Sequence, residues 1–317
     1  MAHMPISGSY PDLSANGAGT SKYIPTLFSQ KATVKHYDMT VCGEITSNDW
    51  EGEVTKMGDK VVIRRTPDVT VGDYQKNLDV TYETPEENAT ELELNKGKYY
   101  AVVLDDVDRI QSDMGLLDMY ADDAAEQVVL KQDLEFLAAL PATVHADNQG
   151  TNAGAKSGTI DLGAVGAPLV IDTENAIKVL MRLNQALTEQ GVSRVGRWVV
   201  LPAWYCSILK NTDVKSALVT GDSEGVIRNG RLGTIDGLTI YESNQLTDYT
   251  DASLNVTPII AGHKDGVTWA NQFINAEVIR LQTKFASAIR GLAVYGFKTV
   301  EPKYLALGRV TPDLSAL

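Results

Sequence analysis

The stretch KYYAVVLDDVDRIQSDMGLLDMYADDAAEQVVLKQDLEFLAALP, residues 98–141, decides the fold because its pattern changes abruptly from strand to helix. Lys98–Leu104 is rich in β-branched and aromatic residues, which is typical of a strand. From Asp113 to Leu140 apolar residues recur at a spacing of three and four, which predicts a helix that Pro141 ends. Its 28 residues would span about 42 Å at 1.5 Å per residue. This is long for a globular domain, where helices average about 11–12 residues.

The predicted helix has one apolar face and one strongly acidic end. Residues 105–126 hold eight acids and one base, and negative charge at a helix N-terminus is favoured by the helix dipole. Asp118, Asp122 and Asp123 could reach one divalent cation, but no 12-residue calcium loop is present, so we expect a solvated acidic face. The face expected to be buried comprises Leu117, Tyr120, Ala121, Ala124, Ala125, Val128, Leu130, Leu134 and Leu137.

Before the helix, the pattern is almost wholly that of strands. Between Glu51 and Lys98 the chain carries 11 acids and 7 bases, so this ribbon has too few apolar residues to form its own core. We therefore expect it to lie on another surface, with Arg64 and Arg65 solvated at its far end, next to the turn Thr66–Asp68. The strands expected here are Lys60–Arg65, Leu78–Thr84, Thr90–Leu94 and Lys98–Leu104.

After a connector rich in Gly, Asn and Ala at 146–168, a second module begins near Asp172. It is predicted to contain a helix that Gly191 stops and a buried strand at Arg197–Leu201, followed by a helix that Pro202 opens. Further strands are expected at Gly237–Tyr241, Thr257–Ala261, Ala286–Val300 and Tyr304–Val310.

The composition excludes several classes of protein. The net charge of −13 argues against a protein that grips nucleic acid broadly, although not against one that encloses it. No segment reaches 18 consecutive apolar residues, so we expect no membrane span. Cys42 and Cys206 lie far apart in unrelated contexts, which favours two buried, reduced thiols. The first 20 residues lack the apolar region of a secretory signal and are typical of a flexible arm.

No arrangement of residues predicts catalysis. Ser157 lies in the connector and not in the strand-to-helix turn of a nucleophile elbow. The stretch Gly230–Gly237 lacks the spacing of a phosphate-binding loop, so we expect a turn-rich connection. The four histidines, His3, His36, His145 and His263, show no metal-ligand spacing. We therefore expect no catalytic, cofactor-binding or metal-binding residue.

Three stretches resemble the major capsid proteins of tailed bacteriophages, whose Hong Kong 97-type fold encapsulins also use. These are Asp59–Asp68 with Val71–Tyr74, Tyr99–Ser112, and Ala288–Pro302, which follow one another in the matching order. The resemblance implies an α+β, Hong Kong 97-like capsid fold. Its parts are an N-terminal arm, an extended β-hairpin loop, a peripheral domain with a long spine helix, and an α/β axial domain.

Carried over to this chain, the resemblance implies five segments. The N-terminal arm and the start of the peripheral domain would occupy 1–49, and the extended loop 50–99. The peripheral domain with the spine helix would occupy 100–165 and the axial domain 166–283. Residues 284–317 would return to the peripheral domain.

The function that the resemblance implies is that of a structural subunit, not an enzyme. Copies would self-assemble as pentamers and hexamers into the icosahedral shell of the virion capsid, in the host cytoplasm, and enclose double-stranded DNA without sequence-specific binding. We expect a portal protein, a separate scaffolding protein and possible decoration proteins as partners, and no membrane. An encapsulin-like compartment shell and an α/β hydrolase remain as alternatives. The residues expected at inter-subunit contacts are Lys60, Arg64, Arg65, Asp68 and Tyr74.

Overall fold

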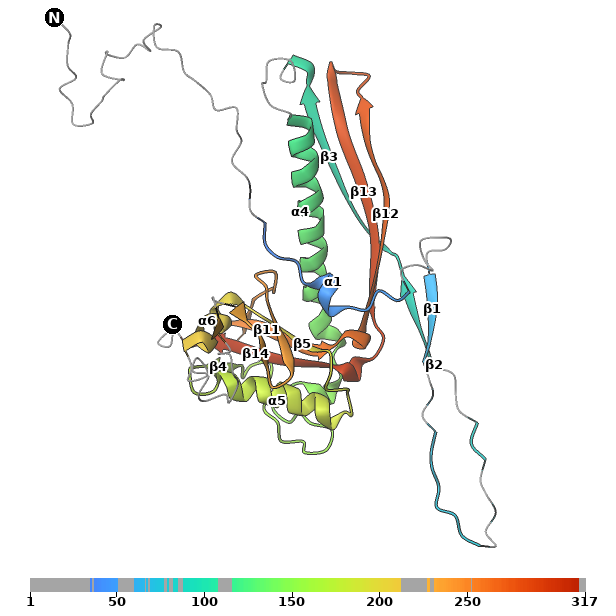
Figure 1. Cartoon of the computed structure of the whole chain (residues 1–317), viewed down its shortest axis with the longest axis vertical. Helices are drawn as coiled ribbons and strands as arrows, with labels where there is room; N and C mark the ends of the chain where they lie inside the picture. The colour runs from blue at the N-terminus through green and yellow to red at the C-terminus, as the bar shows by residue number, and fades with distance from the viewer. Residues whose placement is uncertain are drawn as a thin grey trace, which may run out of the picture.

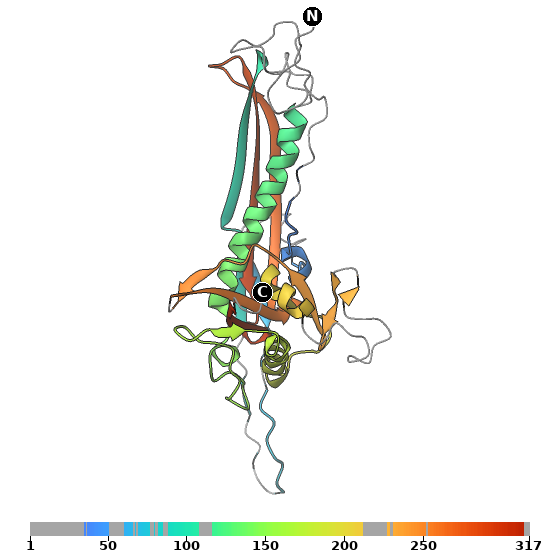
Figure 2. The same cartoon turned by 90° about the vertical axis from the view of Figure 1, so that its left-hand side faces the viewer.

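The computed structural model describes residues 35, 37–50, 60–65, 67, 69–76, 79, 82–84, 88–107, 116–211, 227–228, 231–251 and 253–313. The molecule is elongated, with a long helix and three long strands rising from one side of a compact body (Figure 1). A thin loop extends from the opposite side. The helix lies alongside the strands in both side views (Figure 2).

The rising part consists of one helix and a three-stranded antiparallel sheet. Its strands are β3 (Lys96–Asp105), β12 (Val267–Arg280) and β13 (Ala286–Thr299), in the order β12-β13-β3. The helix α4 (Leu116–Ala139) confirms the predicted long helix over the described residues, and its 24 residues span about 36 Å. Leu140–Thr143 continues as a 3₁₀ turn that contains Pro141.

Helix α4 is fixed to this sheet by a polar contact and by an aromatic cluster. The carboxylate of Glu135 accepts hydrogen bonds from Lys96 and Lys98, each at 2.6 Å, and from the hydroxyl of Tyr295 at 2.8 Å. Phe136, fully buried, packs edge-on against Trp269 and Phe297 with ring centroids 5.7 and 5.2 Å away. Such aromatic pairs contribute energy beyond the area that they bury.

The predicted buried face of α4 is only partly right. Ala124 and Leu137 are buried, but Tyr120 and Leu134 are 40% and 38% exposed. Phe136, which the spacing did not single out, is fully buried. The reason is that α4 contacts the sheet on one side and the N-terminal segment on another, so no single apolar stripe describes it.

The N-terminal segment binds α4 through two aspartates. Asp133, buried to 1% exposure, accepts hydrogen bonds from the backbone N–H groups of Cys42 at 2.9 Å and Val41 at 3.3 Å, where the short helix α1 (Cys42–Ile45) begins. Burial raises the pKa of Asp133, although these backbone hydrogen bonds oppose the shift. Nearer the start of α4, Asp123 accepts a hydrogen bond from the hydroxyl of Tyr37 at 2.7 Å.

The compact body is built on a seven-stranded sheet. The strand order is β4-β14-β11-β5-β9-β8, with β10 paired to the side of β11. β5 is parallel to β9 and β14 is parallel to β4, while β11 is antiparallel to both of its neighbours on this path. The strands are β4 (Leu169–Ile171), β5 (Arg197–Leu201), β8 (Thr234–Ile235), β9 (Leu238–Glu242), β10 (Tyr249–Asp251), β11 (Leu254–His263) and β14 (Leu305–Pro312).

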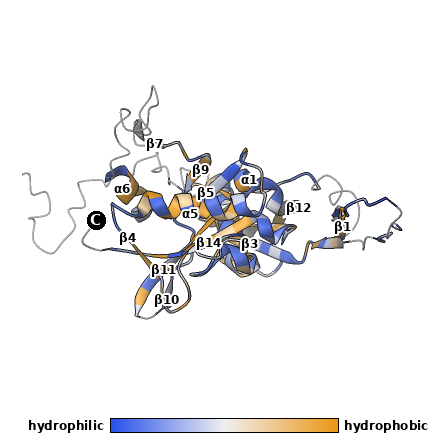
Figure 3. Ribbon diagram, turned by 90° about the horizontal axis from the view of Figure 1, so that it is seen from below, coloured by the Kyte–Doolittle hydropathy of each residue, from blue (hydrophilic) through white to orange (hydrophobic). Residues whose placement is uncertain are grey.

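Alternating residues of this sheet build two separate cores. One set, which includes Val199 and Ile259, packs against α5 (Ala176–Glu189) and α6 (Ala203–Asn211). The other set, which includes Val200 and Ile260, packs against the end of α4. Figure 3 shows hydrophobic segments running through α5, α6 and the strands beside them. All five residues of β5 are buried, which confirms the predicted buried strand.

Strand pairing crosses the predicted division at residue 283 in two places. β12 was assigned to the axial segment, yet it pairs with β13 in the three-stranded sheet. β14 was assigned to the returning segment, yet it pairs with β11 and β4 in the seven-stranded sheet. Only the three-residue 3₁₀ turn Lys264–Gly266 separates β11 from β12, so one β-rich run of the sequence serves both sheets.

The aromatic cluster generates the first prediction. Replacing Phe136 with Ala should lower the free energy of unfolding of the unassembled subunit by about 3–5 kcal/mol, because it removes a fully buried ring and leaves a cavity. The matched control is Leu134→Ala on the exposed side of α4, with an expected loss below about 1 kcal/mol. Urea denaturation followed by tryptophan fluorescence measures both. Equal losses would show that α4 is not packed on this face.

Glu135 generates the second prediction. Although burial opposes ionisation, the hydrogen bonds from Lys96, Lys98 and Tyr295 lower the pKa of Glu135 to about 2 from its ordinary 4.5. The stabilisation is therefore present above pH 4.5 and is lost as the pH falls from 4.5 towards 2. Glu135→Gln should cost about 1–2 kcal/mol at pH 7 and should flatten the loss of stability on acidification.

The same denaturation measurement at pH 7 and pH 3 checks it, with Glu126→Gln on an exposed position of α4 as the control. A Glu135→Gln variant whose stability falls as steeply with acid as that of the parent would contradict the assignment.

Candidate inter-subunit surfaces

The base of the ribbon is anchored to its own chain. β1 (Lys60–Arg65) and β2 (Asn88–Glu93) pair antiparallel, with Ile63 opposite Thr90. Ile63 and Leu92 are buried in a small core cluster together with Ala270 and Val300. A Cβ atom on Gly296 would lie 2.2 Å from the backbone oxygen of Glu93, so only glycine allows this close approach. The ribbon base thus lies on the end of the three-stranded sheet.

The five residues predicted at inter-subunit contacts have different surroundings. Lys60 forms ion pairs across the ribbon with Glu91 and Glu93. Arg65 forms an ion pair with Glu301, so the expectation that it lies solvated at the far end is wrong. Arg64 is exposed, and Tyr74 is 81% exposed. Asp68 lies outside the described residues. Among the predicted residues that the structure describes, Lys60, Arg64 and Tyr74 are thus exposed, and Lys60 is paired within its own chain.

Beyond the ribbon, the chain forms a loop that projects from the body (Figure 1). Its two arms are tied together by Glu83, which accepts hydrogen bonds from the backbone N–H of Thr70 at 3.1 Å and from its hydroxyl at 3.3 Å. The predicted strand Leu78–Thr84 is not a strand at Asp79 and at 82–84, which the structure describes. Four apolar or aromatic side chains of the loop are 68–92% exposed, namely Val69, Val71, Tyr74 and Tyr82.

Of these four side chains, the sequence singled out only Tyr74 as a contact. Tyr82 was included in the predicted strand Leu78–Thr84, and Val71 entered only as part of the matching stretch Val71–Tyr74. A signal was present, since apolar residues in a segment this polar have no core nearby. We call Val69, Val71, Tyr74 and Tyr82 the loop patch.

A second exposed apolar surface lies on the three-stranded sheet. Successive side chains of a strand point to opposite faces, and Lys96 and Lys98 point to α4 because both bind Glu135. Their neighbours Tyr99 and Val103 therefore face away from α4, and they are 79% and 54% exposed. Leu292, opposite Tyr99 on β13, is 39% exposed on the same face.

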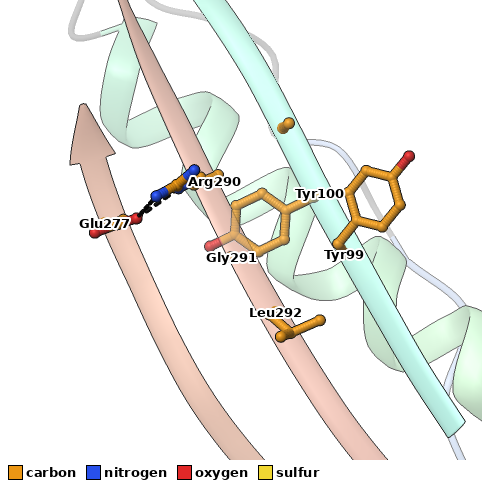
Figure 4. A pocket seen from close by; sticks show the side chains of 7 residues that line it. Tyr99, Tyr100, Glu277, Arg290, Gly291 and Leu292 are labelled. Carbon is orange, nitrogen blue, oxygen red and sulfur yellow. Dashed lines mark hydrogen bonds and ion pairs between the residues drawn. The ribbon is translucent and has the colours of Figure 1, made fainter. Parts of the chain in front are cut away.

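This open face holds a shallow cavity of about 450 Å³. Figure 4 shows Tyr99 and Tyr100 of β3 beside Leu292 of β13, with Arg290 and Glu277 joined as an ion pair at one side. Its lining residues are Tyr99, Tyr100, Ala101, Glu277, Arg290, Gly291 and Leu292. We call it the sheet pocket.

Ser157, which the sequence offered as a candidate for chemistry, makes contacts within the fold. The hydroxyl of Ser157 donates to Glu189 at 3.1 Å, as do two backbone N–H groups of the same turn, and this holds the connector against the end of α5. The hydrogen bonds of this turn, that from the backbone N–H of Ser157 foremost, lower the pKa of Glu189 to about 2. Both cysteines are free and buried, which confirms the expectation for them.

The rings of His145 and His263 each accept the backbone N–H of the second residue after them, where 3₁₀ turns begin. His3 and His36 lie outside the described residues. In the glycine-rich stretch, the described residues Arg231–Gly237 form β7 (Arg231–Leu232), β8 and the turn to β9, as expected of a connection.

At the acidic end of α4, Asp122 is exposed, whereas Asp123 pairs with Lys35 as well as Tyr37. The hydrogen bond from Lys35 and that from Tyr37 lower the pKa of Asp123. Within the described ranges no three His, Cys, Asp or Glu side chains gather as a metal site. No helix among the described residues is both long and apolar enough to span a membrane.

Comparison with known proteins identifies the family. The model of the family described as phage capsid protein matches residues 89–308. No curated protein matches the chain. Among solved structures, one from Mycobacterium phage Che8 is 25% identical with a TM-score of 0.73, over 92% of this chain and 98% of that one.

Two more distant structures share the fold over the whole chain. The capsid of Cyanophage P-SCSP1u has 12% identity and a TM-score of 0.68, covering 95% of this chain and 96% of that one. The mature capsid of bacteriophage PhiM1 has 12% identity and a TM-score of 0.65, covering 97% and 99%. The α+β, Hong Kong 97-like fold inferred from the resemblance is confirmed, and neither a hydrolase nor an encapsulin-like compartment is favoured.

The matched family consists of structural proteins and not enzymes, and the matched capsid structures indicate self-assembly into a shell. The chain belongs to the phage capsid protein family and is a major capsid protein, a structural subunit of the virion shell of a bacteriophage.

Proposed function

We propose that copies of this major capsid protein assemble as pentamers and hexamers of a closed icosahedral shell, with the extended loop, residues 50–99, reaching a neighbouring subunit. The observation that carries the proposal is the loop patch. It presents Val71, Tyr74 and Tyr82 at 81–92% exposure on a segment that extends away from its own body (Figure 1). Several large apolar side chains exposed on one projecting segment favour a site of protein contact.

We further propose that the two sheets belong to two parts of the subunit with different contacts. We assign the peripheral domain to α4 with the three-stranded sheet, and the axial domain to the seven-stranded sheet with α5 and α6. The axial part would meet its copies around the five-fold and six-fold axes, while the peripheral part and the loop would join neighbours. Lys60 is exposed but paired within its own chain, so Arg64 and Tyr74 are the residues of the predicted contact set that we propose meet a neighbour.

The charge of the chain fits a wall around nucleic acid. At −13, the subunit repels the phosphate backbone, so packaged double-stranded DNA would be enclosed without sequence-specific binding. We further propose that assembly takes place in the host cytoplasm with a separate scaffolding protein, and that the shell carries a portal protein and accepts decoration proteins.

If the loop contacts a neighbouring subunit, substitutions in the loop should impair assembly without affecting the folding of the subunit. Tyr74→Ser combined with Tyr82→Ser should change the free energy of unfolding of the subunit by less than about 0.5 kcal/mol each, because both side chains are already solvated. Particle yield should nevertheless fall at least tenfold, since the change recurs at every copy of the contact. Asp79→Asn, an exposed polar position of the same loop, is the matched control and should assemble normally.

Denaturation, sedimentation velocity and negative-stain electron microscopy of the protein co-expressed with its scaffold decide the matter. If the double tyrosine variant formed normal particles, the loop would not be part of the contact between subunits. A parent chain that remains a monomer under these conditions would contradict the assembly itself.

A further inference from the structure

We infer that the sheet pocket receives Tyr74 from the extended loop of a second copy of this chain. The inference rests on the proposed assembly and goes beyond it, because it names the receiving surface and the side chain that enters. One chain carries two exposed apolar surfaces, the loop patch and the sheet pocket.

The two surfaces cannot meet within one chain. β2 and β3 follow each other directly, at Asn88–Glu93 and Lys96–Asp105, so the loop and the sheet both start from the ribbon base. From there, the sheet rises beside α4 and the loop extends the opposite way (Figure 1). The ribbon base itself is fixed by the buried residues Ile63 and Leu92. A loop held in this direction can reach only the pocket of another copy.

The shape of the pocket suits an aromatic side chain. Tyr99 and Leu292 both line its cavity of about 450 Å³, and both side chains lie on the face that α4 does not cover. Gly291 lies opposite Tyr100, and a Cβ atom there would lie 2.4 Å from the ring of Tyr100, so glycine lets that ring lie against β13 on the other face of the sheet. A tyrosine ring entering beside Tyr99 would form an aromatic pair and would remove both rings from water.

One charged side chain of the pocket, Arg290, can meet the acids of the loop. Arg290 is bound to Glu277, yet its side chain remains 57% exposed and keeps N–H donors free for a further acceptor. The described residues of the loop carry the acids Asp73, Asp79 and Glu83 against the single base Lys76. Asp73 is adjacent to Tyr74, so a loop that places Tyr74 in the pocket brings a carboxylate close to Arg290. The phenolic hydroxyl of Tyr74 would find its own partner in the same ion pair.

Such a contact joins two different surfaces, so it is heterologous: each copy gives a loop and offers a pocket. Heterologous contacts that close generate rings, which is what pentamers and hexamers require. The loop would thus bind in the same direction at each successive subunit.

A cysteine pair tests the contact directly. Tyr74→Cys and Leu292→Cys introduce two exposed thiols into a chain whose own cysteines are both buried. The two variants are made separately, mixed, assembled with the scaffold under reducing conditions and then oxidised. An excess of parent chain is included so that particles form even where a variant alone assembles poorly. Val195→Cys, 82% exposed on the compact body, replaces Leu292→Cys in the control mixture.

Non-reducing electrophoresis of the particles should show a disulfide-linked dimer of one Tyr74→Cys chain with one Leu292→Cys chain, at least tenfold above the control mixture. A single chain carrying both changes should give a ladder of multimers instead of an internal disulfide. Particles that form but crosslink only at the control level, or a double variant that crosslinks within itself, would overturn the inference and leave the proposed shell intact. Failure of the parent to form any particle would instead overturn the proposed function.

Discussion

The structure depends on one packing contact, the burial of the last turns of α4 between the two sheets. Phe136, Leu137 and Leu140, all at or below 1% exposure, lie in a single core cluster. Trp269 and Tyr295 enter that cluster from the three-stranded sheet. The seven-stranded sheet contributes Trp198, Val200, Ile260, Leu305 and Leu307. One helix end therefore sets the angle at which the long sheet, and with it the ribbon base, leaves the compact body. Because close-packed interiors resist deformation, this angle is a fixed property of the subunit.

Much of this arrangement could be predicted from local pattern. The long helix, the fully buried strand at Arg197–Leu201 and the abrupt change of period near Asp105 each depend on neighbouring residues, and the structure has all three. The partners of β12 and β14 could not be predicted in this way. β11 and β12 follow each other across a three-residue turn, and nothing local states that Ile260 pairs in one sheet and Trp269 in the other. Strand pairing is a contact between distant residues, so it leaves no local signature.

The same limit applies to the surfaces for assembly. Arg64 and Arg65 are adjacent and chemically identical, yet within the described part of the chain only Arg65 meets a carboxylate, and Glu301 is more than 200 positions away. Likewise, Tyr82 and Tyr295 differ in exposure, 92% against 0%, although each stands in a β-rich stretch. The polarity of the ribbon showed that the segment needs another surface. Only the register of β1 with β2, and their packing on β12 and β13, separates the anchored base from the free loop.

A shell subunit must stay soluble when alone and yet associate strongly when surrounded, and the distribution of its apolar side chains meets both demands. The loop patch and the sheet pocket are small and lie apart, so neither is the broad apolar surface that causes aggregation. The net charge of −13 adds a repulsion that works against random contact. In the proposed closed ring, every subunit would be held by both a donated and a received contact, so the second would form at high effective concentration. Even if each single contact were weak, the number of contacts would then stabilise the complete shell.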